Sequence, residues 1–180
     1  DHALVPAIHK TSFMHDLQLI NLDISTGDFP IEQLSNAIIK SSMIEYACNI
    51  YLSNRKKDIE TPISAWFCPD VLVAEETKRQ IENKNLKVEL ITAKTPLKSR
   101  MEILDKHEKG EVECLVSVGV LSEGWDNPNC NIIVHLRPTL SKVFWGQSVG
   151  RGLRSAKGKE NCLVIDVSSN YSTFGPVEQL

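Results

Sequence analysis

Membrane-directing segments are missing from this sequence. No apolar run approaches the roughly 18 to 20 residues that a helix needs to span a bilayer. The beginning of the chain, from Asp1 to Val5, has neither an initiator Met nor the basic-then-apolar pattern of a signal peptide. We therefore expect a fragment of a cytoplasmic protein without a membrane partner.

Metal-binding and disulfide patterns are also missing. The five cysteines are odd in number and widely spaced, and no C-x-x-C pair occurs. The sequence therefore predicts neither a zinc site nor a disulfide framework. Cys68, Cys114 and Cys162 lie in apolar runs, where a cysteine usually serves as a small buried hydrophobe.

Nucleotide-cradling motifs are missing as well. A P-loop needs Gly-x-x-x-x-Gly-Lys-Ser/Thr, whose amides and lysine hold phosphates while its hydroxyl binds Mg²⁺. The nearest string, Gly158-Lys159-Glu160, lacks that hydroxyl and has the wrong spacing from Gly152. No Asp-Glu-x-His or Asp-Glu-x-Asp metal-holding motif occurs, and no G-x-G-x-x-G opens a helix. The last absence argues against a dinucleotide-binding enzyme.

The composition is that of a globular domain. Of the 180 residues, 42% are hydrophobic and 24% are charged, which is enough for one domain with a core. The net charge of −3 argues against a strongly basic protein that coats nucleic acid. Lysines and arginines can still gather locally into a binding surface.

Short apolar runs alternate with amphipathic stretches from residue 61 onward. Strands that are apolar throughout and separated by helices indicate a parallel sheet covered on both faces. The expected strands are 63–68, 88–92, 114–118, 132–136 and 162–166. The expected helices are 71–83, 97–109 (apolar stripe Met101, Ile103, Leu104; C-cap Gly110) and a third within 141–154. We therefore predict an α/β domain over residues 61–180.

Residues 1–60 have a weaker pattern. The stretch 17–22 has the composition of a strand, and 31–38 and 43–52 carry two helical patterns. We interpret this part as an N-terminal extension with connecting helices that packs on the sheet domain.

Three polar segments follow the later strands. The first is 115–128, a strand that runs into a Gly-Trp-Asp-x-Pro turn, and the second is 136–141, the end of a strand that enters a polar loop. The third is 147–154, with the pattern Gln-x-x-Gly-Arg-x-x-Arg.

The third segment has the chemistry of an anion site. Arg151 and Arg154, three residues apart on the expected helix, would project on one side and reach one anion. Arginine suits phosphate because its planar fork binds bidentately and stays charged, and Gly150 lets a phosphate approach closely. The alternative is a solvated basic helix end that favours the C-terminal dipole. Taken alone, the segment leaves both alternatives open.

Together, these segments resemble the C-terminal, RecA-like domain of superfamily 2 helicases and translocases. Gly124-Trp125-Asp126 with Pro128 matches motif V of that family, and residues 147, 150, 151 and 154 match motif VI. Residues 66–68 match motif IV, and 92–96 resemble its Thr-Gly-x-Thr-Pro segment, with Ala93 in place of Gly. Residues 25–29, 136–141 and 162–177 further resemble bacterial RadD-type DNA-repair helicases and, in part, restriction-enzyme motor subunits.

The resemblance implies a P-loop-NTPase-type fold without its own P-loop. An upstream RecA-like domain of the same chain would then hold most of the ATP and the Mg²⁺. The implied roles are arginine fingers for Arg151 and Arg154 with Gln147 beside them, ATP contacts for Gly124, Asp126 and Gly150, and DNA or RNA backbone contacts for Ser117, Thr92 and Lys94. Such backbone contacts are largely independent of base sequence and sensitive to salt.

Simpler structural roles compete with several of these assignments. Asp126 can stabilise its own turn, Ser117 can bond the backbone of its strand, and Lys94 can be a solvated loop lysine. Trp125 is interpreted as a core residue, and His135 as a satisfied residue at a strand end. The whole chain can also be a non-catalytic docking module that has kept the fold. A P-loop upstream of residue 1 would favour the motor.

We predict that the isolated 180-residue chain has negligible ATPase activity and weak ATP affinity, because it has the arginines but neither a phosphate cradle nor a metal-holding acidic motif. Steady-state hydrolysis and equilibrium ATP binding by the purified chain test this directly. Robust turnover would refute it.

Overall fold

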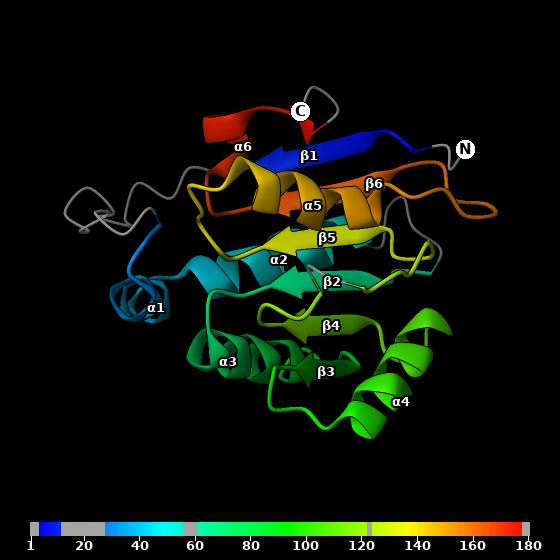
Figure 1. The fold of residues 1–180 in the computed structure, drawn as a ribbon, viewed down its shortest axis with the longest axis horizontal. Coiled ribbons are helices and arrows are strands. Elements are labelled where there is room, and N and C mark those ends of the chain that lie inside the picture. The colour runs from blue at the N-terminus through cyan, green and yellow to red at the C-terminus, as the bar shows by residue number, and fades with distance from the viewer. Residues whose placement is uncertain (1–3, 12–27, 56–60, 122–123, 178–180) are drawn as a thin grey trace.

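A single parallel sheet organises the chain. The computed structural model describes residues 4–11, 28–55, 61–121 and 124–177. Its six described strands lie in the order β1-β6-β5-β2-β4-β3, and every neighbouring pair is parallel (Figure 1). The strands are β1 (Ala7–Thr11), β2 (Ser64–Phe67), β3 (Val88–Ile91), β4 (Cys114–Ser117), β5 (Ile132–His135) and β6 (Cys162–Asp166). The predicted α/β class with a parallel sheet is confirmed.

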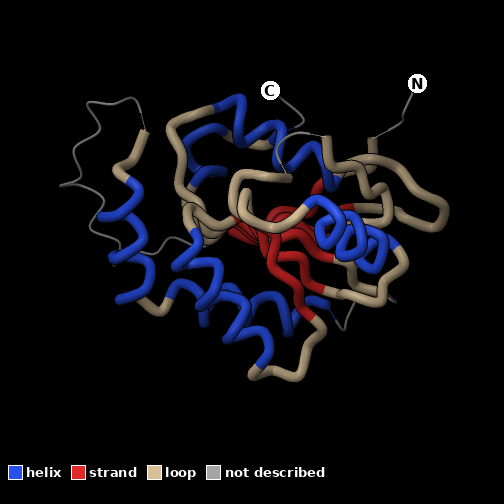
Figure 2. Tube along the Cα trace, turned by 60° about the horizontal axis from the view of Figure 1, so that its bottom comes forward, coloured by secondary structure: helices blue, strands red, loops and turns tan. Residues whose placement is uncertain are grey.

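Helices cover both faces of the sheet. They are α1 (Ile31–Lys40), α2 (Met43–Arg55), α3 (Val71–Glu82), α4 (Leu97–Glu108), α5 (Lys142–Gly152) and α6 (Asn170–Phe174). In Figures 1 and 2, α1, α2 and α3 lie on one face, while α4 and α5 lie on the other. None of the helices in the described ranges is long and apolar enough to cross a membrane.

Alternation along the central strand produces two cores. Trp66 of β2 joins the cluster under α1, α2 and α3, whereas Ala65 and Phe67 join the cluster under α5. Both sides of this strand are fully buried, which explains why its sequence is apolar throughout. All five cysteines are buried and free, which confirms the burial expected for Cys68, Cys114 and Cys162.

The described part of residues 1–60 shares this sheet and this core. Strand β1 pairs with β6, and α1 and α2 contribute Leu34 and Tyr51 to the first cluster. The predicted strand at 17–22 lies outside the described residues. The predicted boundary between residues 60 and 61 stays a prediction, since residues 56–60 also lie outside them.

Two helix ends are capped by residues whose chemistry suits the position. Asp70 accepts a hydrogen bond from the Val73 amide at 2.9 Å and so caps the start of α3. Gly110 follows α4 with a φ of +74°, a left-handed conformation that favours glycine, and the predicted C-cap is therefore confirmed.

The predicted apolar stripe of α4 is wrong at Met101. Its side chain is 63% exposed, and the buried side of the helix is formed by half-buried Ile103 and Leu104 with fully buried His107. Helix α4 follows the edge strand β3, where less sheet is available to cover an apolar face.

Gly152 is where α5 approaches the sheet most closely. A Cβ atom there would lie 2.5 Å from Ile133 Cγ1 and 2.7 Å from Cys162 Sγ, whereas a Cβ at Gly150 would meet nothing within 4 Å. Both positions lie in the same helix, so the two glycines form a matched pair.

We predict opposite effects for alanine at these two positions. Gly152→Ala should lower the free energy of unfolding by about 1–3 kcal/mol, because the core would be overpacked. Gly150→Ala should leave it unchanged or raise it by about 0.5–1 kcal/mol, because alanine favours the helix. Urea unfolding of the 180-residue chain measures both, and equal effects would contradict the close contact.

Candidate functional site

Helix α5 carries Gln147 and Arg151 across the sheet, and Arg154 follows its end. It starts at Ser141, whose hydroxyl accepts from the Phe144 amide at 3.2 Å. Because α5 follows β5 and precedes the parallel β6, it runs back from the carboxyl ends of the strands to their amino ends. Gln147 is exposed midway along it, and Arg151 lies in its last turn.

Arg154 does not lie on this helix, which corrects the prediction of two arginines on one helical face. The helix ends at Gly152, and Arg154 forms an isolated antiparallel bridge with Leu4. The Leu153 carbonyl accepts from the Val5 amide at 2.8 Å. Pairing with the chain before β1 therefore pulls this backbone out of the helix.

The two guanidinium groups still converge, because both reach the segment 118–131. Arg151 Nη1 donates to the Trp125 carbonyl at 2.6 Å. Arg154 Nη1 forms an ion pair with the Asp126 carboxylate, whose side chain is 57% exposed. The Arg154 side chain is 34% exposed, so this charge is only partly withdrawn from solvent.

Segment 118–131 connects β4 to β5 and contains no helix or strand among its described residues. It crosses the face of the sheet between α4 and α5 (Figure 1). Gly124 is exposed and has a φ of +71°, which favours glycine at this point of the crossing. Trp125 is 4% exposed in the second core cluster, and its interpretation as a core residue is confirmed.

A buried polar pair holds this crossing against α4. His107 Nε2 lies 3.0 Å from the Ser64 carbonyl, and its Nδ1 lies 3.1 Å from the Asn127 amide nitrogen. This pattern assigns the neutral Nε2–H tautomer, which donates to Ser64 and accepts from Asn127. Burial lowers the pKa of His107 to about 4. Sequence reasoning missed both residues, because His107 lies outside the motifs and Asn127 is only the variable position of the Gly-Trp-Asp-x-Pro turn.

The residues that are predicted to contact nucleic acid lie at the opposite end of the sheet, where the strands have their carboxyl ends. We call this end the carboxyl edge and the opposite end the amino edge. Ser117 ends β4 and is fully buried, and its hydroxyl donates to the Trp66 carbonyl at 3.4 Å. The structure therefore places Ser117 in the backbone-bonding role considered as its alternative. Its contact with a nucleic-acid phosphate stays a prediction.

Thr92 and Lys94 lie on the loop after β3. The Thr92 amide donates to Thr95 Oγ1 at 3.0 Å, and the Lys94 amide donates to Thr92 Oγ1 at 3.2 Å. Arg100 supports the loop by donating to the Thr92 carbonyl at 3.2 Å. The loop is thus held by its own hydroxyl groups, while the Lys94 side chain is exposed.

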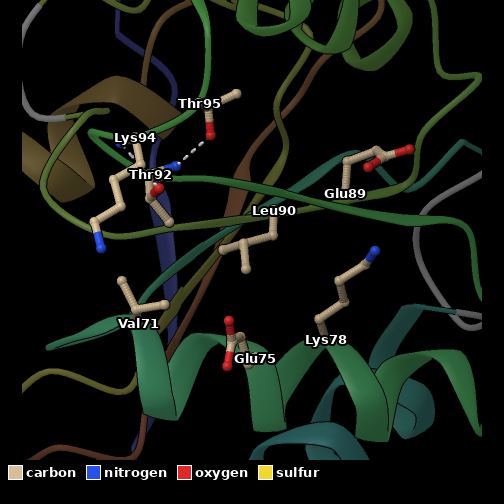
Figure 3. A pocket seen from close by; sticks show the side chains of 8 residues that line it. All are labelled: Val71, Glu75, Lys78, Glu89, Leu90, Thr92, Lys94 and Thr95. Atoms are coloured by element: carbon tan, nitrogen blue, oxygen red, sulfur yellow. Dashed lines mark hydrogen bonds between the residues drawn. The ribbon is translucent and has the colours of Figure 1, made fainter.

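The same loop borders an open depression of about 530 Å³ (Figure 3). Its wall on the helix side comes from α3, and the set of lining residues is Val71, Glu75, Lys78, Glu89, Leu90, Thr92, Lys94 and Thr95. The two lysines give the depression positive groups, and Glu75 and Glu89 offset them.

The loop after β5 is tied to the chain before α1. Arg137 lies 3.6 Å from the Asp28 carboxylate and 4.3 Å from the centre of the Phe144 ring. The Leu140 amide donates to Asp28 at 3.1 Å. These contacts fix the start of α5. The buried His135 beside them bonds Ser148 through Nε2 at 2.7 Å, although no hydrogen-bond partner is found for its Nδ1.

Most of the chain matches a known protein family. Residues 36–156 match the helicase conserved C-terminal domain. The chain belongs to this family. The predicted relationship to the C-terminal, RecA-like domain of superfamily 2 helicases is confirmed.

Two solved structures and one curated protein illustrate the similarity. A fragment of a protein named as an HsdR subunit of a type I restriction enzyme from Vibrio vulnificus is 22% identical, with a TM-score of 0.71 over 97% of this chain and 34% of that chain. A DEAD box protein from Methanococcus jannaschii is 17% identical, with a TM-score of 0.58 over 77% of this chain and 36% of that chain. Both show the fold alone.

The Saccharomyces cerevisiae protein IRC3, named as an ATP-dependent helicase, is 28% identical over 156 residues. These residues are 87% of this chain but only 22% of IRC3. The chain therefore spans about a fifth of the length of this relative.

The side chains around Arg151 and Arg154, at the end of the sheet that we call the arginine edge, suit the phosphates of ATP better than they suit Mg²⁺. Arginine guanidinium groups suit a phosphate, and the open side of Gly150 leaves room beside them. Within the described ranges, no group of three or more His, Cys, Asp or Glu side chains is arranged to hold a metal ion.

We predict that the free energy of unfolding falls as the pH is lowered from about 6.5 toward 4. His107 is neutral in the folded chain but takes up a proton in the unfolded chain below its ordinary pKa of 6.5. One such proton contributes up to about 1.4 kcal/mol per pH unit. Urea unfolding at several pH values should show a smaller dependence for His107→Gln. The burial of His135, which lowers its pKa to about 3, leaves a residual dependence. An unchanged slope in the variant would contradict the assignment.

Proposed function

We propose that this chain is the second motor domain of an ATP-dependent DNA or RNA helicase or translocase, with Arg151 and Arg154 as its arginine fingers. One observation carries the proposal. Arg151 in the last turn of α5 and Arg154 just beyond the helix converge on residues 125 and 126 at one edge of the sheet, and Arg154 is partly open to solvent.

Each residue at this edge has a chemical role in the proposal. Bound ATP would supply the phosphoanhydride bond that is hydrolysed. Arg151 and Arg154 bind its phosphates and offset the charge that develops during transfer. Gly150 permits close approach, Gln147 helps to organise the seam, and exposed Gly124 and Asp126 contact the ribose or phosphates.

The other half of the site is proposed to come from an upstream RecA-like domain of the same protein. That domain would supply the phosphate cradle and the Mg²⁺ ligands. Closure of the two domains on ATP and their release after hydrolysis would step the pair along a strand. The arginine charges then act only in the closed state.

The carboxyl edge is proposed to contact the nucleic-acid backbone through Ser117, Thr92 and Lys94. Lys94 is exposed and supplies a charge for a phosphate. Ser117 would have to exchange its bond to the Trp66 carbonyl for a bond to a phosphate. The 136–141 segment supports a place for the full-length protein near the RadD-type DNA-repair helicases and restriction-enzyme motor subunits.

We predict that Arg154→Ala in the full-length protein lowers nucleic-acid-stimulated ATP hydrolysis by about 10³ to 10⁵. Arg154→Lys should recover little of the rate, because it keeps the charge but loses the planar fork. Arg79→Ala is the matched control, since Arg79 is an exposed arginine on α3 that pairs with Glu76. The measurement is kcat with saturating nucleic acid. A rate close to wild type in Arg154→Ala would favour the non-catalytic docking module instead.

A further inference from the structure

Lys159 lies beyond the two arginines, and its ammonium group points back into the protein. Its Nζ lies 2.9 Å from the Pro128 carbonyl and 2.7 Å from the Cys130 carbonyl. It also lies 2.6 Å from the Gly152 carbonyl and 2.8 Å from the Arg154 carbonyl. An ammonium group has three hydrogens, so four acceptors use its full donor capacity.

One of these carbonyls, that of Gly152, belongs to the last residue of α5, and that of Arg154 lies two residues beyond it. The last carbonyls of a helix have no partner within the helix and carry the negative end of its dipole. A lysine charge placed there satisfies them. Burial lowers the pKa of Lys159, and the four carbonyl oxygens oppose this shift by stabilising the charged form.

The other two carbonyls belong to the segment that carries the partners of the arginines. Pro128 and Cys130 follow closely after Trp125 and Asp126, which Arg151 and Arg154 contact. One cation therefore joins the backbone that bears the arginines to the backbone that they contact. Gly152 packs against Ile133 and Cys162, so the end of α5 has little room to move relative to the sheet.

We propose that Lys159 is a positioning residue for ATP hydrolysis, because its ammonium group sets the relative position of the α5 end and segment 125–130 and thereby the direction of the Arg151 and Arg154 side chains. This inference rests on the proposed function of the two arginines. Lys159 itself contacts neither ATP nor nucleic acid.

The test compares Lys159→Met, Arg154→Ala and their combination in the full-length protein. Misplacing a catalytic group by about 1 Å can cost a hundredfold in rate, so we expect Lys159→Met to lower kcat by about tenfold or more. The KM for ATP should stay within about twofold, because the loss falls on the transition state. Lys157→Met is the matched control, since Lys157 is an exposed lysine on the same turn.

The combined variant separates positioning from a general structural role. If Lys159 acts through the arginines, adding Lys159→Met to Arg154→Ala lowers kcat by a smaller factor than it does in the wild-type protein, because only Arg151 is left to misplace. An additive loss overturns the inference. A normal rate in Lys159→Met beside an impaired Arg154→Ala also overturns it and leaves the proposed function intact. A normal rate in Arg154→Ala overturns both.

A second readout does not depend on activity. Amide hydrogen exchange of the 180-residue chain should become faster at residues 124–130 and 150–155 in Lys159→Met, with little change in α1 and α2. Unchanged or uniformly faster exchange overturns the inference.

If Lys159→Met does not fold, Lys159→Arg is tested in its place. A planar guanidinium group cannot converge on four carbonyls as an ammonium group does. We then expect kcat to fall at least about threefold with KM within about twofold. A kcat equal to wild type overturns the inference.

Discussion

Parallel pairing of the strands is the constraint from which the site follows. Every strand ends at the same edge of the sheet, so each connection must return across a face before the next strand begins. Helix α5 and segment 118–131 are two such connections, and both cross the same face. They therefore bring Arg151, Arg154 and Asp126 to the amino edge, at the opposite end of the strands from Ser117, Thr92 and Lys94.

Segment 118–131 joins the two edges physically. It leaves Ser117 at the carboxyl edge and reaches Asp126 near the arginines before it enters β5. Trp125, buried in the core, and Asn127, bonded to His107, anchor its middle.

The backbone near the two arginines is held by close packing and by hydrogen bonds to its carbonyl groups, whereas the Arg154 side chain stays partly exposed to solvent. Gly152 leaves no space for a side chain between α5 and the sheet, and Lys159 donates to the carbonyls of Gly152 and Arg154. Arg154, by contrast, is paired with a largely exposed carboxylate. An exposed ion pair contributes little to stability, so an anionic ligand at this edge could take over Arg154 at small cost.

Local pattern in the sequence determined the fold class, five strands within one or two residues, the cap at Gly110, and the family through the 124–128 and 147–154 motifs. These features depend on neighbours in the chain, because apolar periodicity and turn chemistry act over a few residues. Only the tertiary structure decided that Arg154 leaves the helix, that Ser117 is buried, and that β1 joins the sheet. It also decided that Lys159 and His107 bond to residues 127–130 of the segment between β4 and β5. Each of these depends on residues distant in sequence, such as Leu4 beside Arg154, and long-range pairing and burial leave no signature in a single local segment.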